Sequence, residues 1–246
     1  MSKPRITKDH WLYTMPVAHR GLHGEGAPEN SMAAFGRAVE AGYAIELDVH
    51  ATKDEQIVVS HDANLSRMFG VDVNIAEHTY AELRNYTMTG TREKLPLLAE
   101  VLRIADVPLL IEIKSEKKVG RLEQALYAQL RNYKGEFALQ SFNPYSLRWY
   151  VKNKPQWLRG QLSCAFEGSD MGGLKKALLK NLHLNFMARP DFISYSVGDL
   201  PCPAVQKARE AGKPILGWTV NSQELADQKK DLIDNIIFEN FTPRKA

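Results

Sequence analysis

The chain has 246 residues, of which 44% are hydrophobic and 25% charged, and it contains only two cysteines, Cys164 and Cys202. These values exclude whole-chain disorder, a collagen-like protein and a disulfide scaffold, and they favour two reduced thiols over one disulfide. A formal net charge of +3 without long basic runs argues against a nucleic-acid partner. The chain shows neither a membrane-length apolar run nor a secretory signal, so we expect a cytoplasmic protein without stable membrane insertion.

Short apolar runs alternate with amphipathic segments along the chain. The runs have the length and flanking turn residues of strands that are buried on both faces. We expect eight such strands, over residues 17–21, 45–50, 109–114, 137–142, 158–162, 192–197, 215–220 and 235–239. Their periodicity and capping residues predict helices over residues 30–42, 119–133, 145–153, 174–182, 203–212 and 222–229.

Eight strands alternating with helices predict a parallel sheet, and eight is the number that closes an α/β TIM (β/α)8 barrel. A doubly wound open sheet is the alternative. Because no linker-like stretch interrupts the pattern, we expect a single domain over residues 1–246. Residues 52–97, after the second strand, exceed what one helix needs and predict a small insertion. It contains an apolar run at 57–60 and a helix near 80–86.

Ionisable residues interrupt the second and third predicted strands. Because side chains alternate between the faces of a strand, Glu46, Asp48 and His50 point to one face. The third strand repeats this pattern with Glu112 and Lys114. Buried carboxylates are costly unless they are paired or bind metal, and three acids at the C-terminal rim of a barrel suit Ca²⁺ or Mg²⁺. A plain ion pair between Glu112 and Lys114 is the alternative.

Two histidines and two cations accompany these acids. His19 and Arg20 end the first predicted strand, and His61 follows the apolar run of the insertion. Histidine titrates near neutral pH and serves as a proton carrier. Arg20 and Lys114 supply more positive charge than a neutral substrate needs, and they fit a phosphate oxyanion. Each histidine also has a plain interpretation as a hydrogen-bonded polar residue, and the sequence does not assign His50.

The segments that contain these residues form an ordered set of motifs. They are His19-Arg20-Gly21, Pro28-Glu29-Asn30-Ser31 at a helix start, Glu46-Leu47-Asp48, His61-Asp62 followed by Leu65 and Arg67, and Glu112-Ile113-Lys114. In this order the chain resembles the glycerophosphodiester phosphodiesterase family from about residue 15 to residue 243. Two later segments are also similar to that family, Ser141-Phe142 and Trp218-Thr219-Val220-Asn221.

The resemblance implies a TIM barrel that hydrolyses glycerophosphodiesters to sn-glycerol 3-phosphate and an alcohol with a divalent cation. It implies a role for each residue type: Glu46, Asp48 and Glu112 as metal ligands, His19 and His61 as general acid and base, and Arg20 and Lys114 as phosphate-binding cations. Which histidine is the acid is not fixed. Trp218 is expected to contact the glycerol, with a core aromatic as the alternative, and the insertion to shape that side of the pocket.

Two segments depart from the family pattern. Residues 236–243 contain Phe238, Glu239 and Phe241 where family members commonly carry Thr-Asp before a proline. The segment Met68-Phe69-Gly70 replaces a threonine-rich stretch. Both segments are expected to shape the pocket wall, so the sequence does not determine which alcohol is preferred. Neither segment contains the proposed metal ligands or histidines.

Two other functions compete with a hydrolase that takes a small-molecule substrate. One is a phospholipase or lysophospholipase-type phosphodiesterase, which we rank lower because the sequence shows no obvious amphipathic or exposed apolar segment. The other is a noncatalytic phosphodiester-binding module, which would not need two proton carriers. The oligomeric state is open, and a homo-oligomer is compatible with the sequence.

Overall fold

The computed structural model describes residues 5–114 and 118–244. Its strands are β1 (Val17–Ala18), β2 (Ala44–Ala51), β3 (Ile57–Val59), β4 (Leu109–Ile113), β5 (Phe137–Ser141), β6 (Arg159–Ser163), β7 (Phe192–Ser196), β8 (Ile215–Val220) and β9 (Asn235–Phe238). They form one sheet in the order β1-β9-β8-β7-β6-β5-β4-β2-β3, and β1 also pairs with β2. Eight strands thus close on themselves while β3 stands outside the ring. This confirms the TIM (β/α)8 barrel over the open sheet.

The chain divides into two compact units, which are described separately. Unit 1 comprises Met1–Val17 and Ala138–Ala246, and unit 2 comprises Ala18–Phe137. The α-helices of unit 1 are α1 (Trp11–Thr14), α7 (Pro144–Asn153), α8 (Gly173–Lys180), α9 (Asn185–Ala188), α10 (Pro203–Glu210) and α11 (Gln223–Lys229). Those of unit 2 are α2 (Met32–Ala41), α3 (Ser66–Phe69), α4 (Tyr80–Leu83), α5 (Leu98–Ile104) and α6 (Arg121–Leu130). The single-domain expectation stays a prediction.

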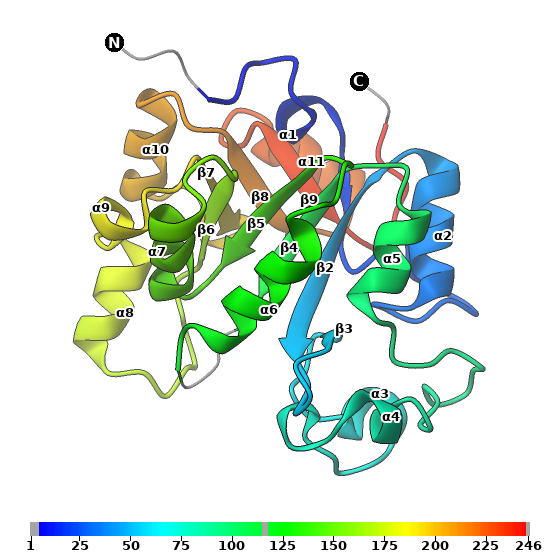
Figure 1. The fold of residues 1–246 in the computed structure, drawn as a ribbon. Helices are drawn as coiled ribbons and strands as arrows, with labels where there is room; N and C mark the ends of the chain where they lie inside the picture. Colours follow the sequence, from blue (N-terminus) through cyan, green and yellow to red (C-terminus); the bar gives the residue numbers. More distant parts are fainter. Residues whose placement is uncertain (1–4, 115–117, 245–246) are drawn as a thin grey trace. The chain divides into compact units, whose positions relative to one another are not determined.

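Unit 2 is built on the parallel pair β2 and β4. Every residue of β2 is buried, as expected for a strand covered on both faces. The first long helix, α2, begins and ends at the predicted signals: the Ser31 side chain accepts from the backbone of Ala34, and Gly42 takes the left-handed conformation, with φ 70°. Figure 1 shows α2 and α5 side by side next to β2. Sequence analysis did not predict α5.

The predicted insertion has a small core of its own. Its apolar run forms β3, which pairs antiparallel with β2, and the predicted helix near 80–86 is the shorter α4. Leu65, Phe69, Ile75 and Leu83 pack together with Val58 of β3, and α3 and α4 lie next to each other beyond that strand (Figure 1). This core gives the loop after β3 a rigid support.

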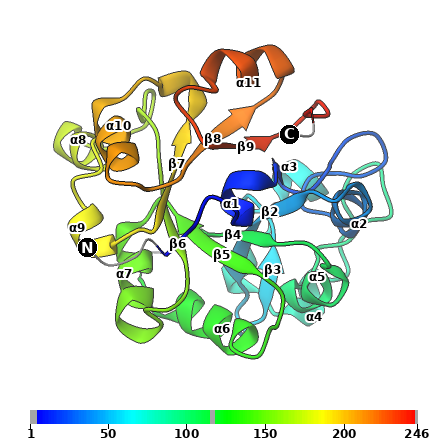
Figure 2. The same cartoon turned by 90° about the horizontal axis from the view of Figure 1, so that it is seen from above.

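In unit 1, strands β6 to β9 run parallel and side by side (Figure 2). Their outer side carries an apolar cluster around Ile193, Tyr195 and Ile215. Both Cys164 and Cys202 are free thiols, in agreement with the preferred interpretation of the sequence. Among the described residues, no helix has the length and apolar character that crossing a membrane requires.

Asn235 at the start of β9 holds α1 in place. Its side-chain Nδ2 donates to the carbonyls of Trp11, Leu12 and Met15, at 3.4, 3.2 and 2.8 Å. We expect Asn235→Ala to lower the free energy of unfolding by about 1–3 kcal/mol, because buried carbonyls lose their donor. Urea unfolding measures this, with Asn153→Ala as a control, since the amide of Asn153 bonds an exposed part of its own helix. Equal losses of unfolding free energy in both variants would show that the side chain of Asn235 does not hold α1 in place.

Candidate active site

Three buried carboxylates meet in unit 2. Glu46 and Asp48 come from β2 and Glu112 from β4, and one carboxylate oxygen of each lies within 4.8 Å of the others. Their exposed fractions are only 1%, 1% and 7%. The parallel register places Asp48 directly opposite Glu112, and Glu46 shares the face of Asp48 two residues earlier. Within residues 5–114 and 118–244, this is the one cluster of potential metal-ligating side chains.

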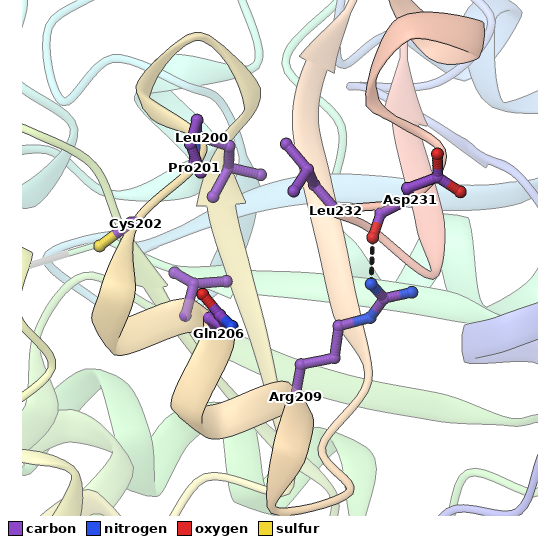
Figure 3. A pocket seen from close by; sticks show the side chains of 8 residues that line it. Leu200, Pro201, Cys202, Gln206, Arg209, Asp231 and Leu232 are labelled. Carbon is purple, nitrogen blue, oxygen red and sulfur yellow. Dashed lines mark hydrogen bonds between the residues drawn. The ribbon is translucent and has the colours of Figure 1, made fainter.

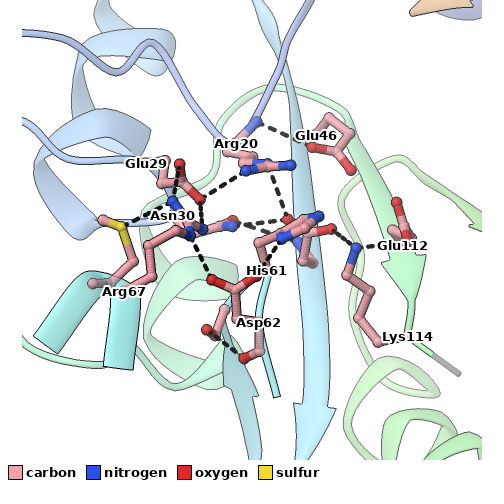
Figure 4. Close-up of polar contacts among 12 residues, drawn as sticks. Arg20, Glu29, Asn30, Glu46, His61, Asp62, Arg67, Glu112 and Lys114 are labelled. Carbon is pink, nitrogen blue, oxygen red and sulfur yellow. Dashed lines mark hydrogen bonds and ion pairs between the residues drawn. The ribbon is translucent and has the colours of Figure 1, made fainter. Parts of the chain in front are cut away.

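Lys114 follows β4 and contacts two acids of this triad. Its Nζ lies 2.9 Å from Oδ1 of Asp48 and 2.8 Å from Oε1 of Glu112 (Figure 4). The ion pair between Glu112 and Lys114 that the sequence left as an alternative is therefore present, but the ammonium is shared with the neighbouring strand. Burial acts to lower the pKa of Lys114, while the two carboxylates outweigh burial and raise that pKa, so the side chain stays charged.

The turn after β1 corrects one prediction. The first strand was expected to reach residue 21, but β1 ends at Ala18, and Arg20 and Gly21 take left-handed conformations, with φ of 55° and 81°. A Cβ at position 21 would lie 2.9 Å from the backbone carbon of Ala34, so only glycine fits against α2 here. The turn directs the Arg20 backbone N–H to Oε2 of Glu46, at 3.0 Å.

The Arg20 side chain lies between two acids. Its Nη1 is 2.8 Å from Oε1 of Glu29, and its Nε is 3.6 Å from Oδ2 of Asp48. Oδ2 of Asp48 also accepts a hydrogen bond from Nδ2 of Asn30, at 2.8 Å. Burial acts to raise the pKa of Asp48, but the charges of Lys114, His61 and Arg20 outweigh it and lower the pKa to about 2. Asp48 is therefore the ionised member of the triad.

At the other two acids, burial outweighs the effect of the nearby cations. Burial and the charges of Asp48 and Glu112 raise the pKa of Glu46 well above its usual range. Burial also raises the pKa of Glu112, to about 7, against the opposing charge of Lys114. Three buried acids thus face two nearby cations, and their oxygens are the ligands that hard divalent cations prefer. The oxygen donors, and the raised pKa values of two acids that a bound cation would lower, fit the divalent cation that the family resemblance implies.

His61 lies in the loop after β3 and is held by a chain of polar contacts. Its Nδ1 is 2.7 Å from Oδ1 of Asp62, and Oδ2 of Asp62 accepts from Nε of Arg67, at 2.6 Å. Arg67 also donates to both oxygens of Glu29, at 3.0 and 2.6 Å, and Glu29 in turn pairs with Arg20 (Figure 4). The imidazole is thus connected to the turn after β1 through alternating acids and cations. Burial lowers its pKa, which favours the neutral ring.

The remaining predicted residues occupy separate places. His50, which the sequence left unassigned, is buried, and its Nε2 lies 3.3 Å from the carbonyl of His61. Because burial lowers the pKa of His50 to about 4, it is a neutral support for the loop. His19 is the half-buried first residue of the turn after β1. Trp218 belongs to β8 of unit 1, where its ring packs edge-to-face on Phe142, with centroids 5.6 Å apart.

Four residues of the site had no predicted role. Asn30 and Glu29 hold Asp48 and Arg20, while Asp62 and Arg67 hold His61. All four occur in the quoted motifs. One sequence signal was available: an acid next to a candidate catalytic histidine suggests a partner that orients the ring. The contact between Glu29 and Arg67 spans 38 residues and has no local sequence signal.

A separate pocket in unit 1 lacks comparable chemistry. It lies along α10 and the segment after α11, and apolar side chains such as Leu200, Val205 and Leu232 line most of it (Figure 3). Its charged residues are Arg209 and Asp231, and Arg209 donates to the backbone carbonyl of Asp231. None of the predicted site residues lines this pocket, so the cluster in unit 2 is the candidate active site.

Comparison with known proteins places the chain in a family. Residues 19–242 match the model of the glycerophosphoryl diester phosphodiesterase family. The chain belongs to this family. The match covers all five motifs on which the resemblance rested, and it confirms the predicted family.

Relatives within this family differ in how much of the chain they match. A lysophospholipase D from Rattus norvegicus is 42% identical over 134 residues, which are 49% of this chain and 42% of that protein. The chain therefore spans about two fifths of the length of such relatives. A glycerophosphodiester phosphodiesterase from Caldanaerobacter subterraneus subsp. tengcongensis is 29% identical over 93% of this chain and 95% of its own length.

A solved structure has the same fold. The phosphodiesterase of Oleispira antarctica, determined in complex with the product sn-glycerol-3-phosphate, matches with a TM-score of 0.74 at 23% identity. The match covers 92% of this chain and 93% of the other. It supports the barrel topology described above.

Proposed function

We propose that this member of the glycerophosphoryl diester phosphodiesterase family hydrolyses glycerophosphodiesters to sn-glycerol 3-phosphate and an alcohol at the acidic cluster of unit 2. One observation carries the proposal: three buried carboxylates converge within 4.8 Å beside two cations. The name of the Caldanaerobacter relative and the product bound to the Oleispira enzyme support this substrate class.

The acidic triad is proposed to hold a divalent cation, Ca²⁺ or Mg²⁺, through Glu46, Asp48 and Glu112. When bound, such a cation offsets the negative charge that builds up on the phosphoryl oxygens. The Lys114 ammonium and the Arg20 guanidinium, both in ion-pair contact with Asp48, are proposed to bind the same phosphate. Arg20 is suited to this because its planar fork has donors beyond those that contact Glu29 and Asp48.

His61 and His19 are proposed to move the protons. With Nδ1 of His61 donating to Asp62, the Nε2 lone pair is available to accept a proton, and the lowered pKa keeps the ring neutral. His61 therefore takes the proton of the nucleophile, which is either water or the neighbouring hydroxyl of the substrate glycerol. His19 gives a proton to the leaving alkoxide. Such transfers typically accelerate a reaction about 10²–10⁴-fold.

Asp62 is a positioning residue for His61 in this scheme. We expect Asp62→Asn to lower kcat by at least ~10-fold with little change in KM, because the amide cannot hold the same tautomer of the ring. The pH profile of kcat should shift as well, which a purely structural defect would not cause. Asp72→Asn is the control, since Asp72 accepts a hydrogen bond from Asn64 at the exposed edge of the insertion. A normal kcat and pH profile in Asp62→Asn would remove Asp62 from the mechanism.

A lysophospholipase D activity is the second candidate, because the similarity to the Rattus protein reaches 42% identity. The two functions are separated by measuring glycerol 3-phosphate release from glycerophosphocholine and choline release from lysophosphatidylcholine. We expect turnover of glycerophosphocholine to be faster. Faster turnover of the lysolipid would favour the second candidate, and binding of both without turnover would favour the noncatalytic module.

Three further expectations stay predictions. They are the contact of Trp218 with the glycerol moiety, the cytoplasmic location and the oligomeric state. The side chain of Trp218 is part of unit 1. If it contacts the glycerol as predicted, Trp218→Leu should raise KM for glycerophosphocholine and retain kcat.

A further inference from the structure

The segment that follows β6 in unit 1 exposes apolar and basic side chains together. Leu174 at the start of α8 is 78% exposed and Phe186 on α9 is 76% exposed, the two highest values among the large apolar residues described. Residues 171–190 contain four cations, Lys175, Lys176, Lys180 and Arg189, and neither Asp nor Glu. We call these six residues the α8–α9 surface.

Helix α8 is attached through backbone hydrogen bonds and half-buried leucines, Leu178 and Leu179, while Leu174, Lys175 and Lys180 stay exposed. It has no buried residue. Its C-terminal carbonyls accept hydrogen bonds from two strands, Leu179 from Oγ of Ser163 at 2.9 Å and Lys180 from the hydroxyl of Tyr195 at 3.2 Å. Helix α9 packs on α7. Figure 1 shows α8 and α9 near each other at the edge of unit 1, on the left of the view. A Leu-bearing helix of this kind normally buries its apolar stripe against the core. In α8 the stripe is only half-buried at Leu178 and is exposed at Leu174.

We propose that the α8–α9 surface docks on an anionic lipid surface. Peripheral membrane segments combine lysines, which attract anionic headgroups, with Leu or Phe side chains that enter the boundary of the acyl chains. The α8–α9 surface contains both kinds of side chain, and all of its charged residues are positive. This goes beyond the proposed phosphodiesterase activity and is independent of it, because none of the residues involved belongs to the acidic cluster of unit 2.

Two other occupants fit less well. A second copy of the chain in a two-fold contact would place four cations against the same four cations, which repel one another. A nucleic acid would use the cations but would leave Leu174 without a role, since its aliphatic side chain cannot stack on bases. An anionic membrane uses both kinds of side chain. The sequence pattern alone did not reveal this surface, because Leu174 and Leu178 are spaced like residues that face a core.

Vesicle flotation tests the proposal with four proteins. Wild type is mixed with vesicles of phosphatidylcholine alone or of phosphatidylcholine with phosphatidylglycerol. The variants are Leu174→Ser/Phe186→Ser, Lys175→Glu/Lys180→Glu, and a control with the same charge change on other exposed lysines, Lys207→Glu/Lys230→Glu. Thermal unfolding and hydrolysis of glycerophosphocholine in solution are measured for all four, so that a folding defect or a failure of the proposed activity is seen separately.

We expect wild type and the control to bind the anionic vesicles and to bind neutral vesicles at least ~10-fold more weakly. Each of the other two variants should bind the anionic vesicles about tenfold or more weakly than wild type, with unfolding and hydrolysis unchanged. The proposal is overturned if wild type binds neither vesicle or binds both equally. It is also overturned if Leu174→Ser/Phe186→Ser binds as wild type does, because the surface would then be a general polyanion site.

Discussion

Replacing His61 with alanine is expected to lower kcat for glycerophosphocholine by about 10²–10⁴-fold, the usual contribution of a general base. KM should change little, because the acidic triad, Arg20 and Lys114 stay in place. Steady-state release of glycerol 3-phosphate measures both constants. We expect a loss of the same order for His19→Ala, since the leaving alkoxide would then depart without a proton.

The matched control is another histidine of the insertion. His78 bonds the carbonyl of Asn74 through Nδ1, and we give it no part in the reaction. His78→Ala should keep the wild-type kcat. If His61→Ala kept it as well, His61 would have no catalytic role, and the contacts with Asp62 and Arg67 would serve only to hold the insertion.

The second large effect is expected for Glu46, which is buried next to the two other acids of the triad. Its carboxylate is 1% exposed and shares a space of 4.8 Å with two others. Burial and the two neighbouring acids oppose the ionisation of Glu46 and raise its pKa, which costs stability at neutral pH. Glu46→Gln removes this cost, so the protein without cation should be stabilised by about 1 kcal/mol or more, which raises Tm by roughly 2–4 °C in a chain of this size. The same variant should lose both the response of Tm to added Ca²⁺ or Mg²⁺ and the hydrolytic activity.

Glu123→Gln is the control for this experiment. Glu123 is also buried in unit 2, but its carboxylate accepts the backbone N–H of Gly120 at the start of α6, away from the triad. Glu123→Gln should keep the wild-type rise of Tm on cation addition. The gain in unfolding free energy behind that rise is RT ln(1+[L]/Kd), or ~2.7 kcal/mol at a hundredfold excess over Kd. A full cation response in Glu46→Gln would show that Glu46 is not a ligand.

The acidic triad was predictable because it depends on short-range rules. Alternation along a strand places Glu46 and Asp48 on one face, and a parallel neighbour brings Glu112 opposite. The turn after β1 was not predictable, because side chains alternate between two faces only where the chain is extended. Arg20 and Gly21 leave the extended region where the turn packs on α2, so Arg20 reaches Asp48 from a turn.

The support of His61 and the exposure of α8 depend on tertiary structure in a different way. Arg67 of the insertion contacts Glu29, which lies 38 residues earlier in the sequence, and no periodic pattern encodes a pairing over such a separation. For α8, the sequence predicts the helix but not its environment, because the same spacing of leucines occurs in buried and in surface-attached helices. The sequence interpretation that no apolar segment is exposed was therefore wrong for Leu174 and Phe186.

Glycerol 3-phosphate release from glycerophosphocholine, measured for the wild-type chain after chelation and after re-addition of Ca²⁺ or Mg²⁺, tests whether hydrolysis at the acidic triad needs a cation. We predict that chelation abolishes hydrolysis, that one of the two ions restores it, and that Glu46→Gln is not restored by either. Hydrolysis that continues unchanged in the chelated protein, or that the ion restores in Glu46→Gln, would contradict a cation-dependent site at the acidic triad.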